Sequence, residues 1–152
     1  MITVQIDSFQ HSMPELREIF ISHHRELGLL KWMMPLDPQY DEYVRREATG
    51  ILFLVTARRD GKIVGYYIAQ AAPGFHYRST LTGTMDICYV VPEERNRGLV
   101  LPLFRHTEQE LRRRGVKVWY SGYKTENPMG LDRLLPMFGF QPADTYMIRA
   151  LI

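Results

Sequence analysis

Hydrophobic and polar residues follow two different periods along this chain. Residues 2–6 alternate singly, which predicts a short strand. A helical period follows, and the Ser-Met-Pro-Glu box at residues 12–15 predicts the start of a helix that Gly28 ends. After a loop at 29–38, residues 40–48 predict a second, shorter helix. The apolar face of the first helix contains Leu16, Ile19, Phe20, His23 and Leu27.

From residue 51 onward the period is two, so strands are expected. Residues 51–57 and 62–71 predict two strands, and the Asp-Gly pair between them supplies the positive φ angles that a tight hairpin turn needs. A third strand is expected at 84–91, where Pro92 ends it.

A helical period returns at residues 99–114, and Gly115 separates it from a strand-like segment at 116–120. Together with the strand at 84–91, these segments predict a β-α-β unit. Its two strands are parallel, and the crossover between them is expected to be right-handed.

The end of the chain predicts a short helix at 131–138 and a last strand at 145–151. No linker, repeat or low-complexity stretch interrupts the sequence, and 152 residues is the length of one compact domain. We therefore predict a single α/β (α+β) domain over residues 1–152.

Composition narrows the class of protein. The single cysteine, Cys88, excludes an internal disulfide and a zinc site of several cysteines, and it is typical of a reducing compartment such as the cytoplasm. The histidines lack metal-binding spacings, so no metal is expected. No uncharged apolar run reaches about 18 residues and no signal peptide is visible, so we expect no association with a membrane.

The basic residues are mostly arginine. The net charge is only +2, from 19 basic and 17 acidic residues, but fifteen of the basic residues are Arg. Since Arg binds planar oxyanions through a fixed fork of donors, this bias indicates phosphate or carboxylate partners. The base composition of the genome is an equally good explanation.

The most informative stretch is residues 85–100, where a strand enters an Arg- and Gly-containing turn that opens a helix. The first N–H groups of that helix have no partner within it, and the helix dipole favours an anion there. Arg95 and Arg97 flank these amides, and Gly98 permits a close approach to the backbone. These residues predict a phosphate-binding turn.

This stretch, Tyr-Val-Val-Pro-Glu-Glu-Arg-Asn-Arg-Gly at residues 89–98, resembles the acetyl-CoA motif of the GNAT superfamily of N-acetyltransferases. Val100 departs from that motif, which usually has Gly or Ala there. Residues 60–67, 111–116 and 134–140 are similar to other GNAT segments, so the resemblance covers roughly residues 51–152. The sequence as a whole is similar to those of small phage-encoded members of the superfamily.

The resemblance implies a GNAT fold, with a mixed, mostly antiparallel sheet, a central splayed parallel strand pair and flanking helices. It also implies acetyl-CoA as co-substrate, with pantetheine between the splayed strands and the pyrophosphate on the turn. Asn127 is included only because of its place in the family pattern. The implied cofactor-binding residues are Cys88, Tyr89, Val90, Arg95, Asn96, Arg97, Gly98, Leu99, Val100 and Asn127.

Acetyl transfer needs a neutral amine, so the site must lower the pKa of the amine, supply a base or relay the proton through water. Asp86 is the candidate base, because family members often place a carboxylate on this strand. Alternatively, Asp86 pairs with an arginine or faces solvent. His76 is a second candidate base, although a loop histidine is more often merely exposed. Cys88 is expected to lie in the core or line the slot rather than act as a nucleophile.

The largest departure from the family is Leu135, which stands where a tyrosine usually protonates the leaving thiolate. Three alternatives follow. Another hydroxyl reaches the sulfur, with Tyr123 as the candidate beside Tyr120 and Tyr89; or the thiolate leaves without an acid; or the protein binds acyl-CoA without turning it over.

The leading functional hypothesis is an acetyl-CoA-dependent N-acetyltransferase that acts directly on a small-molecule, protein or peptide amine. One alternative is a catalytically silent acyl-CoA sensor, which Leu135 motivates. The other is an interaction module in which the arginines at 112–114 and the loop at 32–34 contact a macromolecule. Nucleic acid is disfavoured, because cations in the last turn of a helix also stabilise its dipole. The loop at 32–34 is open to three readings: an acceptor pocket, a homodimer contact, or core beneath a loop.

Overall fold

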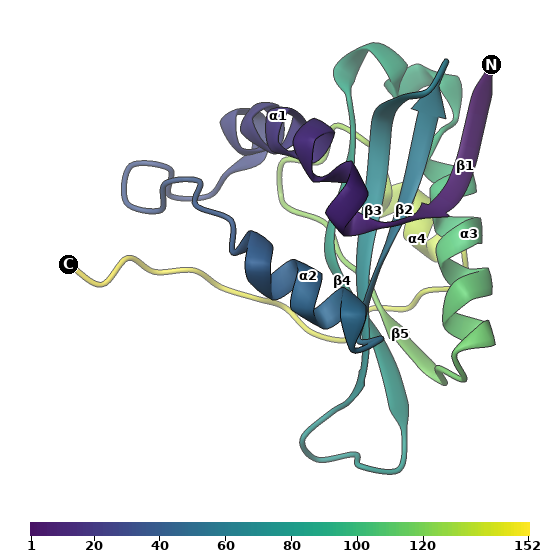
Figure 1. The fold of residues 1–152 in the computed structure, drawn as a ribbon. Helices are drawn as coiled ribbons and strands as arrows, with labels where there is room; N and C mark the ends of the chain where they lie inside the picture. Colours follow the sequence, from purple (N-terminus) through teal and green to yellow (C-terminus); the bar gives the residue numbers. More distant parts are fainter.

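The computed structural model describes residues 1–152, which form one five-stranded sheet with helices on both faces (Figure 1). The strands lie in sequence order, β1 to β4 pair antiparallel, and β4 and β5 pair parallel. This confirms the predicted mixed, mostly antiparallel sheet. The strands are β1 Ile2–Asp7, β2 Leu52–Arg59, β3 Lys62–Pro73, β4 Leu81–Val90 and β5 Val118–Tyr120.

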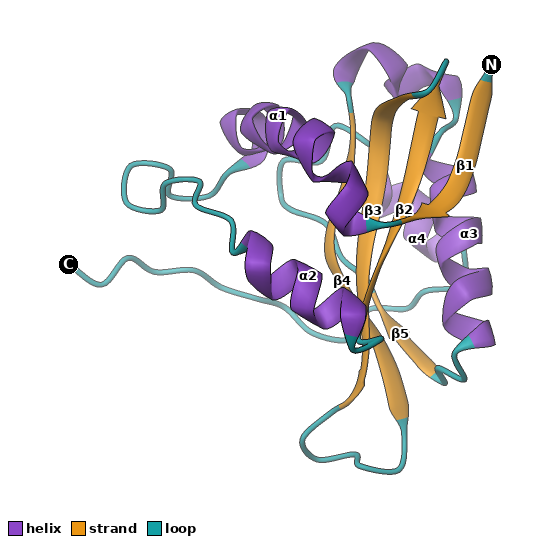
Figure 2. Cartoon of the chain, viewed as in Figure 1, coloured by secondary structure: helices purple, strands orange, loops and turns teal.

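Helices α1 and α2 cover one face of the sheet, and α3 and α4 cover the other (Figure 2). A 3-10 helix, η1, connects β4 to α3. None of the helices combines the length and apolarity needed to cross a membrane. The helices are α1 Phe9–Leu27, α2 Tyr40–Ala48, η1 Pro92–Arg97, α3 Val100–Arg113 and α4 Leu131–Met137.

The two faces of the sheet carry separate hydrophobic cores. Along β2, Leu52 and Leu54 face the α1 side, whereas Phe53 and Val55 face the α3 side, and all four are buried. Because both faces are covered, β2 is a continuous apolar run rather than an alternating one.

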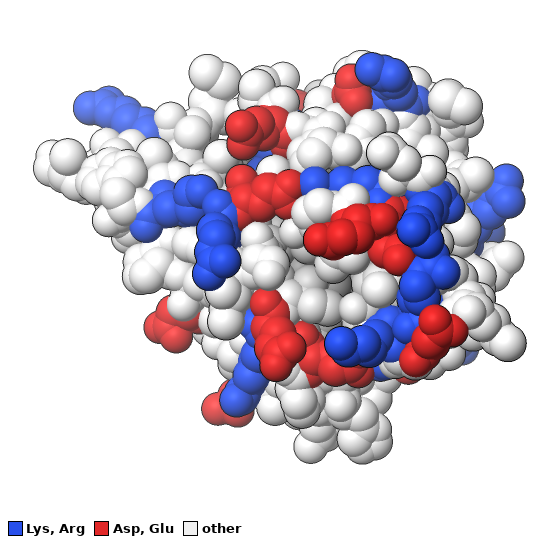
Figure 3. Space-filling model, turned by 90° about the horizontal axis from the view of Figure 1, so that it is seen from above, with Lys and Arg blue, Asp and Glu red and all other residues white.

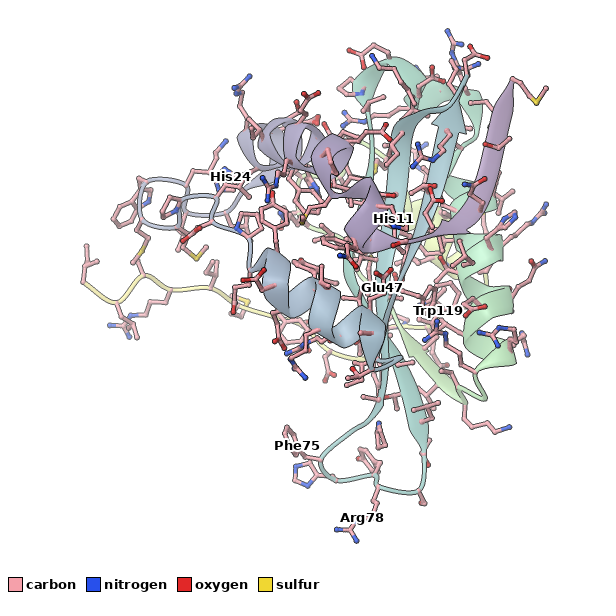
Figure 4. The ribbon with its side chains drawn as sticks, in the orientation of Figure 1. His11, His24, Glu47, Phe75, Arg78 and Trp119 are labelled. Atoms are coloured by element: carbon pink, nitrogen blue, oxygen red, sulfur yellow. The ribbon has the colours of Figure 1, made fainter.

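The structure corrects the start of the first helix, which begins at Phe9 and not at Ser12. The side chain of Ser8 accepts a hydrogen bond from His11 N, and the Glu47 carboxylate of α2 accepts one from Phe9 N at 2.5 Å (Figure 4). Ser12 is buried within the helix. The sequence pattern missed this start because Glu47 reaches the helix end across 38 residues of chain.

Strands β4 and β5 separate after a short shared segment. Only three positions pair, the last being Thr84 with Tyr120, while β4 continues to Val90. The register between β3 and β4 shifts at Ile68/Ala69, which leaves Asp86 as the extra residue of a bulge. The expected splayed parallel pair is therefore present, and the slot opens beside the C-terminal half of β4.

The strand predicted at residues 145–151 is wrong. Residues 141–152 form no helix or strand, and almost all of them are exposed. Phe140 is the last packed residue, with its ring 4.8 Å from that of Trp119 on β5. The alternation in this segment reflects β propensity, but a strand forms only where a partner strand lies beside it.

Candidate active site

Two cavities lie in the region where β4 leaves β5. The first, of about 480 Å³, is polar, and four residues expected from the sequence line it: Arg95, Asn96, Tyr123 and Asn127. The second, of about 420 Å³, is more apolar and lies between α1, the loop at 29–38, α2 and Ile87 of β4. Beyond Ile87 it is lined by Phe20, His23, Met34, Leu36, Tyr43 and Lys124, among others.

The backbone of Val90 faces away from β3 and towards the polar cavity. Its carbonyl accepts a hydrogen bond from Arg95 Nε at 2.9 Å, and its N–H donates to the Met129 sulfur at 3.2 Å. The next residue, Val91, returns to the sheet by donating to the Val64 carbonyl. The amide that sequence reasoning assigns to thioester binding is therefore covered by the side chain of Met129.

Arg95 lies between the turn and α1. Its guanidinium forms a bidentate ion pair with Glu26, at 2.6 and 2.5 Å, and stacks 5.3 Å from the centre of the Tyr89 ring. Tyr89 Oη also donates to Glu26, at 2.9 Å. The hydrogen bond to Arg95 is the main cause that lowers the pKa of Glu26 and raises that of Arg95. Arg95 thus ties the turn to α1 as well as lining the cavity.

The turn before α3 has the features of an anion site. Gly98 has a φ of 72°, and a Cβ at this position would meet no atom within 4 Å. Leu99 precedes the helix, so no side chain caps the first amides of α3. Arg97 is 58% exposed and only 3.7 Å from Glu94, whose carboxylate is already bound by Arg59. The residues present fit a pyrophosphate group at this turn.

Asn127 lines the polar cavity, and its side chain binds the first residues of α4. Its Oδ1 accepts from Leu131 N at 3.0 Å, and its Nδ2 donates to Asp132 at 2.7 Å. Asn127 thereby satisfies an amide at the start of α4, which has no other side-chain partner there. Nothing in the sequence pattern around Asn127 predicts this role.

Asp86 accepts a hydrogen bond from Tyr43 Oη of α2 at 2.6 Å. Burial raises the pKa of the half-buried carboxyl, against the opposing effects of the Tyr43 hydrogen bond and the Arg46 charge. Burial also raises the pKa of Tyr43, so the phenol keeps its proton. The bulge places a carboxyl with a raised pKa beside the apolar cavity that Tyr43 lines.

His23 is a site residue that sequence reasoning placed only on the apolar face of α1. Its Nδ1 lies 2.6 Å from Tyr66 Oη, and its ring stacks on Tyr89 at 4.3 Å. Burial, followed by the nearby Lys124 charge, lowers the pKa of His23 to about 4. The signal in the sequence was a histidine among apolar positions, but its partner Tyr66 lies 43 residues away.

Other sequence candidates lie elsewhere. Cys88 is buried in the α3-side core, where burial raises the pKa of its thiol to about 12. Leu135 belongs to the same core. His76 is exposed in the loop between β3 and β4. Phe75 and Arg78 of the same loop point away from the body of the molecule (Figure 4).

The arginines at 112–114 form ion pairs along α3. Arg112 binds Glu108 at 2.8 Å, while Arg113 and Arg114 both bind Glu110 at 2.7 Å. On the face seen in Figure 3, basic and acidic side chains are interspersed. No group of His, Cys, Asp and Glu side chains is arranged to hold a metal ion.

Comparison with solved structures identifies the fold. A ribosomal-protein-alanine N-acetyltransferase from Brucella melitensis biovar Abortus 2308 matches with a TM-score of 0.73 and 17% identity over 99% of both chains. An aminoglycoside acetyltransferase from an uncultured soil metagenomic sample matches with a TM-score of 0.77 and 15% identity, over 100% of this chain and 99% of the other. A predicted acetyltransferase from Clostridium acetobutylicum, solved with acetyl-CoA, matches with a TM-score of 0.72 and 15% identity, over 99% and 96%.

Sequence comparison gives a consistent result at the level of the family. No curated protein sequence matches this chain significantly. The model of the acetyltransferase (GNAT) family, in contrast, matches residues 13–130, which is more than half of the chain. The chain, which also has the splayed β4–β5 pair and the uncapped turn before α3, therefore belongs to the GNAT acetyltransferase family.

Proposed function

We propose that this protein transfers an acetyl group from acetyl-CoA directly to a primary amine. The observation that carries the proposal is the geometry of β4. This strand loses its β5 partner after Thr84, runs on to Val90 and leads into the uncapped start of α3. In this arrangement the backbone of Cys88, Tyr89 and Val90 holds pantetheine as an added strand would. The amides from Arg97 to Val100 hold the pyrophosphate, with Arg95 and Asn96 at its side.

Asp86 is proposed to take the proton from the attacking amine. An alkylamine with a pKa of about 10.4 is neutral about once in 2,500 molecules at pH 7, which costs about 4.6 kcal/mol. A carboxylate with a raised pKa next to the acceptor reduces this cost by accepting the proton during attack. Tyr43 is proposed to orient the carboxylate through its 2.6 Å hydrogen bond.

Tyr123 is proposed to protonate the leaving thiolate. Of the three candidate hydroxyls, Tyr123 lines the polar cavity and Tyr89 is committed to Glu26. Tyr120 lies at the end of the pairing between β4 and β5. The position usual in the family is Leu135, which is buried in the core and offers no proton.

The apolar cavity is proposed to hold the acceptor. Its lining includes one carboxylate, Asp37, and one ammonium, Lys124, so it does not match a polycation. Several structural neighbours are aminoglycoside acetyltransferases, one of them solved with sisomicin. We expect this chain to prefer an amine with an apolar body, and to act in the cytoplasm, where its free thiol stays reduced.

Ligand-induced stabilisation and thiol release test the proposal together. Acetyl-CoA and CoA at millimolar concentration should raise the melting temperature, because a ligand that binds only the folded state stabilises it by mass action. Thiol release is then measured with phenethylamine, an aminoglycoside and a peptide with N-terminal alanine. We expect release to be fastest with phenethylamine. If neither ligand raises the melting temperature, the acetyl-CoA site is wrong.

A silent acyl-CoA sensor is the second candidate, and one contact favours it. The Met129 sulfur accepts the hydrogen bond of the Val90 N–H, a donor that the carbonyl oxygen of a reacting thioester would need. Stabilisation by acetyl-CoA without thiol release for any amine would support the sensor over the enzyme.

A further inference from the structure

The apolar cavity has basic groups at one end and acidic groups at the other. The basic end lies at the last turns of α1, where His23, His24 and Lys124 line it. Figure 4 shows His24 at this end of α1, beside the loop that follows the helix. The acidic end lies at α2: Asp37, just before this helix, lines the cavity, and Asp86 is hydrogen-bonded to the helix. A molecule that fills the cavity therefore meets opposite charges at its two ends.

An apolar stretch separates the two ends. At the acidic end, the centre of the Phe20 ring on α1 lies 6.5 Å from that of Tyr43 on α2. At the basic end, Lys124 Nζ donates to the carbonyl of Leu27, the last residue of α1, at 2.5 Å. From Phe20 to Leu27 the helix rises about 10 Å, so the two ends are about that far apart. Phe20 and Ile87 are among the apolar side chains that line the cavity.

Lys124 has unused hydrogen-bond donors. An ammonium group can donate three hydrogen bonds, and only the one to Leu27 is made within the chain. No carboxylate lies within ion-pair distance of Lys124. Burial lowers the pKa of Lys124, because the ammonium loses hydration without gaining a counter-ion. A ligand with a negatively charged group would supply the missing partner.

His23 adds a neutral donor at the same end. Tyr66 is fully buried, and its hydroxyl has one partner, His23 Nδ1, at 2.6 Å. The hydroxyl therefore donates to Nδ1, because a buried donor without an acceptor would be costly. With a pKa of about 4 the His23 ring is neutral at pH 7, so its own proton is on Nε2. Burial first, and then the charge of nearby Lys124, lowers this pKa, which places the two donors at the same end.

We propose that the acceptor carries a carboxylate at the opposite end of an apolar body from its amine, and that Lys124 and His23 bind this carboxylate. This carboxylate site rests on the proposed function, because acetyl transfer places the amine beside Asp86. One ammonium and one neutral donor match a single negative charge, so a carboxylate suits this end better than a phosphate dianion. An α-amino acid suits the cavity poorly, because its carboxylate lies next to its amine and would face Asp86.

The reaction of such an acceptor yields an N-acetyl acid. The new C–N bond replaces the C–S bond of acetyl-CoA, and the amine proton ends on the CoA sulfur. The products are therefore the N-acetyl acid and the CoA thiol, and the carboxylate bound by Lys124 is unchanged.

Two isomeric acceptors test the position of the carboxylate. Para-carboxyphenethylamine and phenylalanine contain the same atoms and charges, but only the first separates its amine from its carboxylate. Para-carbamoylphenethylamine is the neutral control of the same shape. In thiol release with acetyl-CoA, we expect kcat/KM for the acid to exceed that for the carbamoyl compound by about 10- to 100-fold, and phenylalanine to be the slowest of the three. Equal values for the acid and the carbamoyl compound would overturn the carboxylate site and leave the proposed acetyl transfer standing.

Lys124→Met tests the residue that binds the carboxylate, because it removes the ammonium and keeps the length of the side chain. The preference for the acid over the carbamoyl compound should disappear in this variant. Lys31→Met is the matched control, because Lys31 Nζ also donates to a carbonyl near the end of α1, that of Arg25 at 2.6 Å, but does not line the cavity. Lys31→Met should keep the preference. A preference that survives in Lys124→Met, or that is lost equally in both variants, would overturn the role of Lys124.

Calorimetric titration separates the carboxylate site from the proposed function, because it measures binding without turnover. Each isomer is titrated into the protein with CoA present, and the acid should bind at least about 10-fold more tightly than phenylalanine. This result without thiol release from any amine would support the carboxylate site and remove the acetyl transfer. Equal Kd values for the two isomers would overturn the carboxylate site whatever the rates of thiol release.

Discussion

The polar cavity lies next to the end of β4, where Arg95 and Met129 contact Val90, and the apolar cavity is lined by Ile87 of the same strand, but the two are built in different ways. The polar cavity is lined by two short segments, residues 95–96 and residues 123–133, both from the second half of the chain. The apolar cavity takes residues from α1, the following loop, α2 and β4, which are far apart in sequence. Glu26 connects the two regions, because it extends from α1 to bind Arg95 in the turn.

The charges of the two regions differ as well. Beside the polar cavity, the ion pair between Glu26 and Arg95 favours the charged forms of both groups, because it lowers the pKa of Glu26 and raises that of Arg95. Around the apolar cavity, burial favours the neutral forms of Asp86 and His23. One side is therefore organised to bind a charged group firmly, and the other to exchange a proton.

The largest effect is expected for Asp86→Asn, which keeps the shape of the side chain but removes the base. We expect kcat to fall by about 10²- to 10⁴-fold, the usual contribution of a general base, with the affinity for CoA unchanged. Steady-state kinetics with the best amine of the panel and a CoA binding curve measure the two quantities. Tyr43→Phe should lower kcat less and shift its pH dependence. A kcat close to wild type for Asp86→Asn would remove Asp86 from the mechanism.

The second prediction concerns the stability of the apolar side. The pKa of His23 is about 4 in the folded protein and about 6.5 when unfolded, so the unfolded state binds the proton first as pH falls. The contribution of neutral His23 to the free energy of unfolding is complete above pH 6.5 and is lost as the pH falls from 6.5 to 4. The loss is on the order of 3 kcal/mol, since one pKa unit is about 1.4 kcal/mol. Glu26, whose pKa is lowered from 4.5, affects stability only at lower pH.

Denaturant unfolding from pH 7.5 to 4 measures this loss. In His23→Gln the decline between pH 6.5 and 4.5 should largely disappear, while in His11→Gln, where the histidine is exposed, it should persist. An equal pH slope for wild type and His23→Gln would show that His23 is not held neutral by its surroundings.

The third prediction concerns the polar side. Gly98→Asp introduces a negative charge and a side chain at the anion turn, so we expect the Kd for CoA to rise about 10- to 100-fold, or about 1.4 to 2.8 kcal/mol. Gly115→Asp is the matched control, because Gly115 also has a positive φ, of 82°, and open space for a Cβ. It lies past the other end of α3. If both variants weaken CoA binding equally, backbone strain rather than the anion site explains the effect.

The sequence predicted the fold better than it predicted the site. Strands β1 to β5, the helix after Gly98 and the splayed pair follow from local periods and one motif, whereas the strand predicted at 145–151 does not form. The hydrogen bond from Phe9 N to Glu47 at the start of α1, the Tyr43–Asp86 pair and the contact of His23 with Tyr66 each join residues about 40 apart. Periodicity shows which face of an element is buried, but it does not show which polar side chains meet across two elements.

The smallest effect is expected for a substitution of Met129, which lines the polar cavity and contacts Val90 at the proposed thioester site. Its sulfur covers the Val90 amide through a weak hydrogen bond of 3.2 Å, so binding of a thioester must displace it. In Met129→Ala the amide is already free, and we expect the KM for acetyl-CoA to fall about two- to threefold with kcat unchanged. Met137→Ala, at an exposed methionine of α4, is the control and should change neither constant. A higher KM in Met129→Ala would mean that this side chain helps to bind the co-substrate, which would turn the contact with Val90 from an obstacle into part of the site.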